Sequence, residues 1–222
     1  MSHYSLSAKI IHFISAVLIT SLTILGLYMV SVEDKKLMIF LFDTHKSLGI
    51  LVLVTLVIRI ISKLKSEKVY KLDGHSSVED ILSSVIQKTF YSLLFIVPIS
   101  GWLMTNAAGF TVSMFGLIEL PSLSIESEAL MTVYRGIHFY STAIFTFLIA
   151  IHVIGALKHH FIDKDETLQR MFSHKVGTLG GVTIAVLTGM FLFFSVELWI
   201  SGLGESSTTH EKAHDTSHQS AH

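Results

Sequence analysis

The sequence predicts an all-α membrane protein, and three observations support this fold class. Half of the 222 residues are hydrophobic and only 15% are charged, against about 25% charged residues in a typical soluble domain. The mean hydropathy is +0.61. The apolar residues also gather in runs of about twenty or more, which is the length that a helix needs to cross a bilayer.

Five such runs predict five transmembrane helices, of which the first four form a bundle and the fifth is an additional helix. They cover Ile10–Val30, Thr44–Ser62, Val85–Met104, Gly136–Leu157 and Val176–Ile200. The apolar run Leu37–Phe42 precedes the second helix and gives it a second candidate starting point. Pro98 lies inside the third helix, and membrane helices tolerate the kink that a proline introduces.

Lysine and arginine are unevenly divided between the two sides of the predicted membrane. One side has eleven of them: Lys9, Arg59, Lys63, Lys65, Lys68, Lys71, Lys88, Lys158, Lys164, Arg170 and Lys175. The other side has five: Lys35, Lys36, Lys46, Arg135 and Lys212. The richer side is expected to be cytoplasmic, which places the N-terminus inside and the C-terminus outside. No small-residue cleavage signal follows the first helix, so we interpret that helix as retained.

Four histidines lie within the predicted helices, where ionisable residues are rare and are functional candidates. His138 and His152 share the fourth helix; fourteen residues separate them by about 21 Å and bring them within about 40° of one face. His45 lies near the outer end of the second helix, and His12 near the inner end of the first. Depth alone therefore pairs His12 with His152 and His45 with His138.

Each pair is suited to hold one haem between two helices, because imidazole is a common axial ligand of haem iron. Iron bound on both faces has no open position and would carry electrons. The chain has no cysteine, which excludes disulfides, cysteine-ligated iron–sulfur clusters and the covalent attachment of c-type haem. The alternative interpretation is a set of scattered polar residues in a transporter, or a proton relay.

Several other residues are weaker candidates. Arg135 and Lys46 on the outer side, and Arg59 on the inner side, are placed to contact haem propionates, although a side chain that only reaches the membrane interface gives the same pattern. Glycines in the first four helices allow a flat macrocycle or another helix to come close. These glycines are Gly26, Gly49, Gly101 and Gly155.

The C-terminal tail, residues 201–222, has a histidine at every fourth position. On a helix this spacing gives one stripe of imidazoles, and such a stripe can bind zinc, copper or nickel weakly. The polar composition favours a solvated, disordered tail, with weak metal binding as the alternative. The four residues are His210, His214, His218 and His222.

With these residues in view, the chain resembles the bacterial cytochrome b561 family. The most specific segment is His138, fourteen residues, His152, and then the run from Ala156 to Leu168, which contains His159-His160 and Lys164-Asp165. The resemblance covers residues 4–175 and is consistent with a haem-binding unit at 1–175, an additional helix at 176–200 and the tail. Further matching stretches are Tyr4-Ser5, Ile11-His12-Phe13, Thr44 to Gly49, Val57-Ile58-Arg59, Phe95 to Gly101 and Met114 to Leu117.

The resemblance implies two non-covalent haems b in the bacterial inner membrane, bound by the pairs His12/His152 and His45/His138. It also implies electron transfer linked to ubiquinone or menaquinone. One branch of the family passes electrons from superoxide to ubiquinone, and others are expected to serve a periplasmic redox partner. The chain departs from the family at Phe13, where tryptophan is common, and at the start of the third helix, which lacks the histidine of some members.

Two other functions are compatible with parts of the pattern. The chain could be the cytochrome b anchor subunit of a hydrogenase or dehydrogenase complex, although its short loops offer little docking surface. It could instead be a non-redox metal transporter whose tail collects the metal. Beyond membrane lipid and quinone, the expected partners include a second copy of the chain as a homodimer; the net charge of −1 gives no sign of nucleic acid binding.

Overall fold

The computed structural model describes residues 5–65 and 77–163. This part contains four long helices, each long and apolar enough to cross a membrane, so four of the predicted spans are confirmed. The predicted fifth span and the histidine-rich tail lie outside the described residues. The helices are α1 (Leu6–Met29), α2 (Lys35–Lys65), α3 (Ser77–Ala107) and α4 (Glu128–Lys158), and α4 continues into a short π-helix, η1 (His159–Asp163).

Three helices, α2, α3 and α4, begin well before the predicted spans, and polar side chains cap two of them there. α2 starts at Lys35, where the Asp34 carboxylate accepts the Leu37 backbone N–H at 2.8 Å. α4 starts at Glu128, where the Ser127 hydroxyl accepts the Leu130 N–H at 3.4 Å. Such caps satisfy N–H groups that have no partner in the first turn of a helix.

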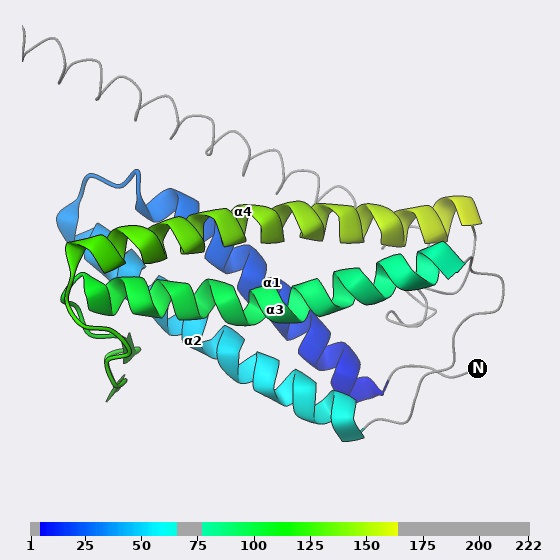
Figure 1. Cartoon of the computed structure of the whole chain (residues 1–222), viewed down its shortest axis with the longest axis horizontal. Coiled ribbons are helices and arrows are strands. Elements are labelled where there is room, and N and C mark those ends of the chain that lie inside the picture. The colour runs from blue at the N-terminus through cyan, green and yellow to red at the C-terminus, as the bar shows by residue number, and fades with distance from the viewer. Residues whose placement is uncertain (1–4, 66–76, 164–222) are drawn as a thin grey trace, which may run out of the picture.

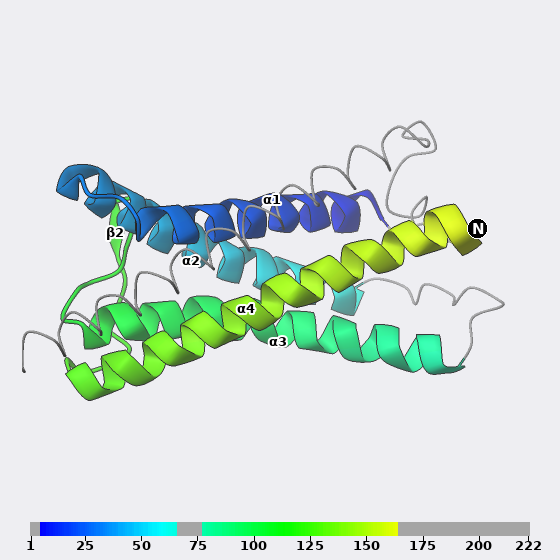
Figure 2. The same cartoon turned by 90° about the horizontal axis from the view of Figure 1, so that it is seen from above.

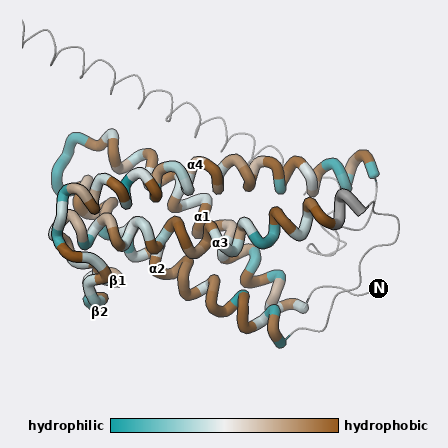
Figure 3. Tube along the Cα trace, viewed as in Figure 1, coloured by the Kyte–Doolittle hydropathy of each residue, from teal (hydrophilic) through white to brown (hydrophobic). Residues whose placement is uncertain are grey.

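The four helices form two layers (Figures 1 and 2). α1 lies beside α2 in one layer and α3 beside α4 in the other, as Figure 2 shows from above. The turn between α1 and α2 and the segment between α3 and α4 lie at the same end of the bundle, which we call the hairpin end. Hydrophobic residues predominate along the helices, whereas the turn between α1 and α2 is largely hydrophilic (Figure 3). This pattern fits a bundle that spans a membrane lengthwise.

A two-stranded hairpin lies between α3 and α4. Its strands β1 (Ser113–Met114) and β2 (Ile118–Glu119) are antiparallel. Phe115 and Gly116 both have positive φ, at 51° and 69°, and the Leu117 N–H bonds the Met114 carbonyl at 3.0 Å. Two successive residues with positive φ are typical of the type I′ turn, whose twist matches that of the strands.

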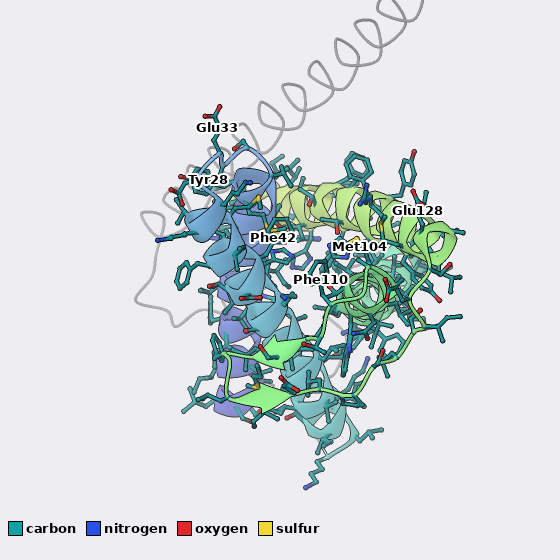
Figure 4. The ribbon with its side chains drawn as sticks, turned by 90° about the vertical axis from the view of Figure 1, so that its left-hand side faces the viewer. Tyr28, Glu33, Phe42, Met104, Phe110 and Glu128 are labelled. Carbon is teal, nitrogen blue, oxygen red and sulfur yellow. The ribbon has the colours of Figure 1, made fainter. Side chains whose placement is uncertain are left out.

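Ser47 of α2 fixes this hairpin to the bundle. Its hydroxyl, which is buried, accepts the backbone N–H of Phe115 at 2.9 Å and lies 3.2 Å from the carbonyl of Ser113. Figure 4, which looks onto the hairpin end, shows the two strands in front of α2. The segment between α3 and α4 is therefore held against α2 at a defined depth.

The centre of the bundle is apolar. Phe145 of α4 is 6% exposed and belongs to a buried hydrophobic cluster with residues of α2 and α3. Its position is seven residues from each of His138 and His152, and seven residues return to within about 20° of the same helix face. An apolar layer therefore separates the two histidine levels. The other members of the cluster are Val52, Leu56, Leu93 and Leu94.

Candidate functional site

The structure brings the four helical histidines together in two pairs. At the end opposite the hairpin, the ring centroids of His12 from α1 and His152 from α4 are 6.3 Å apart, with 64° between the ring planes. At the hairpin end, the centroids of His45 from α2 and His138 from α4 are also 6.3 Å apart, with 76° between the planes. These are the pairs that depth predicted, and we call them the inner pair and the outer pair.

The separation within each pair fits one metal ion between two imidazoles. A metal ion bound by an imidazole nitrogen lies about 2.0–2.1 Å from that nitrogen, so two rings on opposite sides of it have centroids about 6.4 Å apart. The described residues contain no group of three or more histidine, cysteine or carboxylate side chains that could hold a metal ion. A donor set of two imidazoles per site suits haem iron, which takes only its axial ligands from the protein.

The tautomer of His138 is determined by its partner. Its Nδ1 lies 2.8 Å from the backbone carbonyl of Val97 on α3, and a carbonyl can only accept. Nδ1 therefore carries the proton and Nε2 has a free lone pair, which is the form that binds a metal. The Ser100 hydroxyl donates to the same carbonyl at 2.8 Å. Sequence reasoning missed this support, because the acceptor is a backbone carbonyl and leaves no mark on residue type.

His45 has a different environment. Its Nδ1 is buried and has no hydrogen-bond partner in the described part of the chain. A buried polar atom of this kind costs free energy unless another group satisfies it. The unpaired nitrogen leaves His45 with capacity for a further interaction, as a metal ligand requires.

Two of the four predicted glycines make room for the outer pair. A Cβ atom on Gly26 would lie 3.1 Å from Cε1 of His45, and one on Gly101 would lie 3.1 Å from Cε1 of His138. Each imidazole of the outer pair therefore packs against the backbone of a neighbouring helix. A Cβ on either of the other two would meet nothing within 4 Å: Gly49 and Gly155.

The predicted propionate contacts separate into two classes. Arg59 lies at the inner pair, with its Nη2 3.0 Å from Nδ1 of His12. Lys46 is instead in an ion pair with Asp43 at 2.7 Å, and the exposed Arg135 donates to the sulfur of Met131 at 3.0 Å. Both of these outer cations have a partner on their own helix, one turn away.

Aromatic residues adjoin the inner pair. The Phe90 ring of α3 makes edge-to-face contacts with His152, at 5.4 Å between centroids, and with Phe145, at 5.7 Å. Sequence reasoning did not select Phe90 or Phe145, although the spacing of Phe145 from the two histidines of α4 was readable. Beyond the pair, His159 of η1 lies 3.1 Å from the Asp163 carboxylate.

Comparison with known proteins places this geometry in a family. The family model for prokaryotic cytochrome b561 matches residues 3–174, a range that contains both histidine pairs. The chain belongs to the prokaryotic cytochrome b561 family. It is therefore a membrane cytochrome that binds haem b and transfers electrons.

Individual relatives of this cytochrome agree with the family assignment. Cytochrome b561 homolog 2 of Escherichia coli (strain K12) is 32% identical over 178 residues, which cover 80% of this chain and 95% of the relative. The protein named probable superoxide oxidase CybB of Yersinia pestis is 30% identical over 60% of this chain and 75% of its own length. Cytochrome b561 homolog 1 of Escherichia coli (strain K12) is 29% identical over the same shares.

Proposed function

We propose that this cytochrome holds two haems b, one in each histidine pair, and transfers electrons between the quinone pool and another donor or acceptor. The observation that carries the proposal is the equal 6.3 Å separation of the two pairs, which matches the spacing of two imidazoles on one metal ion. Bound haem supplies a one-electron iron couple.

In this proposal the protein would supply two histidine ligands to each haem and an apolar layer between the two sites. His12 and His152 hold the inner haem, and His45 and His138 hold the outer one. Nδ1 of His138 keeps its proton on the Val97 carbonyl, so Nε2 is the ligating atom of that residue. Arg59 is the best-supported candidate for a propionate contact, because it lies beside the inner pair. Lys46 and Arg135 are the candidates at the outer site.

We further propose that electrons cross the bacterial inner membrane between these sites. The excess of lysine and arginine around the inner pair supports a cytoplasmic location for that end, and the hairpin end is then periplasmic. The apolar layer around Phe145 would lie between the two sites.

Superoxide is our first candidate for the electron donor, because one relative is named a probable superoxide oxidase. Two superoxide anions would each give up one electron and leave as O₂, and one quinone would take up the two electrons and two protons to become a quinol. The alternative donor or acceptor is a periplasmic redox protein.

Haem quantification on purified protein tests the proposal. We expect about two haems b per chain and a sharp α-band in the dithionite-reduced minus oxidised spectrum, followed by quinone reduction when superoxide is generated. Protein that is made with ample haem supply and still contains none would overturn the proposal, and would favour metal transport. Co-purification of a large periplasmic subunit would instead identify an anchor subunit of a dehydrogenase or hydrogenase.

A further inference from the structure

The inner pair has a cationic neighbour that the outer pair lacks in the described part of the chain. Nη2 of Arg59 lies 3.0 Å from Nδ1 of His12. Arginine stays protonated in proteins. The described ion pairs are Lys46–Asp43, Lys158–Asp163 and His159–Asp163, so no described carboxylate neutralises Arg59.

Two polar groups near the outer pair are a carbonyl oxygen and a lysine whose charge is compensated. The contact at Nδ1 of His138 is the negative end of a carbonyl dipole, that of Val97. The cation next in sequence to His45 is Lys46, and its charge is compensated by Asp43 at 2.7 Å. A hydrogen bond from the distal N–H of an imidazole ligand to a carbonyl makes the ligand more basic, which favours the oxidised metal.

The hydrogen bond between Arg59 and His12 also has a consequence for haem binding. Because a guanidinium can only donate, Nδ1 of His12 accepts, and a neutral His12 then carries its proton on Nε2. Iron binding through Nε2 requires that proton on Nδ1. Arg59 must then exchange His12 for an anionic acceptor beside it, and a haem propionate is the anion that the site would bring.

On these grounds we propose that Arg59 is a positioning residue that makes the inner haem the higher-potential site, so that electrons run from the hairpin end to the opposite end. The inference rests on the proposed two-haem function. A positive charge beside the inner site, even one that faces a propionate, stabilises that site once it has gained an electron. With haem bound in both pairs, one electron would pass from the outer site to the inner site, and that transfer would move no proton. The outer donor would be a one-electron reductant, and the inner acceptor would be a quinone, which takes up two such electrons and two protons.

A redox titration of the purified holoprotein, followed by the haem absorption bands, tests this inference. The variants His12→Ala and His45→Ala each keep only one haem site, so they show which of the two wild-type potentials belongs to which site. We expect the inner haem to be reduced first. In Arg59→Gln, the electron distribution, which is the equilibrium ratio of reduced outer haem to reduced inner haem, should rise at least tenfold. A tenfold change corresponds to 59 mV for a one-electron couple. Arg59→Lys should restore most of that shift, because it keeps the charge.

The matched control is Lys63→Gln, one helical turn further along α2. Lys63 is exposed and bonds Gln87 at 3.3 Å, so solvent screens its charge. We expect Lys63→Gln to change the electron distribution between the two haem sites by less than twofold.

Three results would overturn the inference. The first is an inner haem that is the lower-potential site in the wild type. The second is an Arg59→Gln distribution equal to the wild type, and the third is a Lys63→Gln shift as large as that of Arg59→Gln. If both Arg59 variants lose the inner haem, as a propionate contact allows, the order of the two potentials in the wild type decides the inference. Haem content is measured in every preparation: two haems with unchanged potentials contradict only this inference, whereas wild-type protein without two haems contradicts the proposed function as well.

Discussion

The imidazole of His138 packs directly against the backbone of Gly101, because a Cβ atom at position 101 would lie 3.1 Å from Cε1 of the ring. The same distance separates a Cβ on Gly26 from Cε1 of His45. At these glycines, the backbones of α1 and α3 thus pack directly against the imidazoles of the outer pair. Residue size at these two positions therefore controls where the outer imidazoles can lie.

Gly101→Ala tests this control. The added methyl group should push the His138 ring from its position, and we expect the outer haem content to fall at least twofold while the inner haem stays. Haem per chain and the reduced spectrum measure the change. The control is Gly136→Ala on α4, where a Cβ meets nothing within 4 Å and alanine favours the helix by about 1 kcal/mol. Equal haem content in both variants would contradict the role of the close contact.

Single alanine variants of the four histidines test the pairing itself. His12→Ala and His152→Ala should remove the same inner haem, and His45→Ala and His138→Ala should remove the outer one, because each haem needs both of its axial ligands. Optical and electron paramagnetic resonance spectra of the purified variants distinguish the two haems. The assignment is wrong if each variant keeps two normal six-coordinate low-spin haems.

Phe145→Ala tests the apolar layer between the two sites. Removal of a buried ring should leave a cavity and lower the free energy of unfolding by about 3 kcal/mol. Reversible unfolding in mixed detergent micelles measures this loss. Phe147, on the same helix but 66% exposed, provides the control: Phe147→Ala should cost less than about 1 kcal/mol, since its ring leaves no cavity. A similar loss in both variants would show that Phe145 is not part of a packed layer.

Ser47→Ala tests the attachment of the hairpin to α2. The variant leaves the Phe115 N–H without the acceptor it has at 2.9 Å, at a cost of about 1–2 kcal/mol. Backbone amide exchange in residues 110–120 should then become about tenfold faster. The control is Thr44→Ala, one turn earlier on α2. The hydroxyl that it removes donates to the Phe40 carbonyl of the same helix, so amide exchange in the hairpin should stay as in the wild type.

Much of the bundle was predictable from the sequence. Four spans follow from runs of apolar residues, and the two histidine pairs follow from depth along those spans. The start of α2 at Lys35 lies close to the second candidate start at Leu37, and Asp34 caps the helix there. The start of α4 at Glu128 was not predicted, because a hydropathy argument ends where polar residues begin, whereas capping by Ser127 extends the helix further.

The outer cations were the least predictable part of the site. Lys46 and Arg135 have the charge and depth expected of propionate contacts, but each has a partner on its own helix, Asp43 and Met131. Such partners one turn away are geometrically available as soon as the helix forms. Charge and depth alone do not distinguish them from Arg59, whose partner His12 lies 47 positions away in the chain.

The sequence by itself predicted the four membrane helices that the structure describes and two levels of histidine on them, because hydropathy and helical rise are local properties of the chain. Only the tertiary structure decided which imidazole nitrogen of His138 is free, which glycines face the outer pair, and which pair has an arginine beside it. Those features depend on contacts between helices whose residues are far apart in sequence. Val97 and Arg59 act on histidines of other helices, and only the packed bundle brings them within hydrogen-bonding distance.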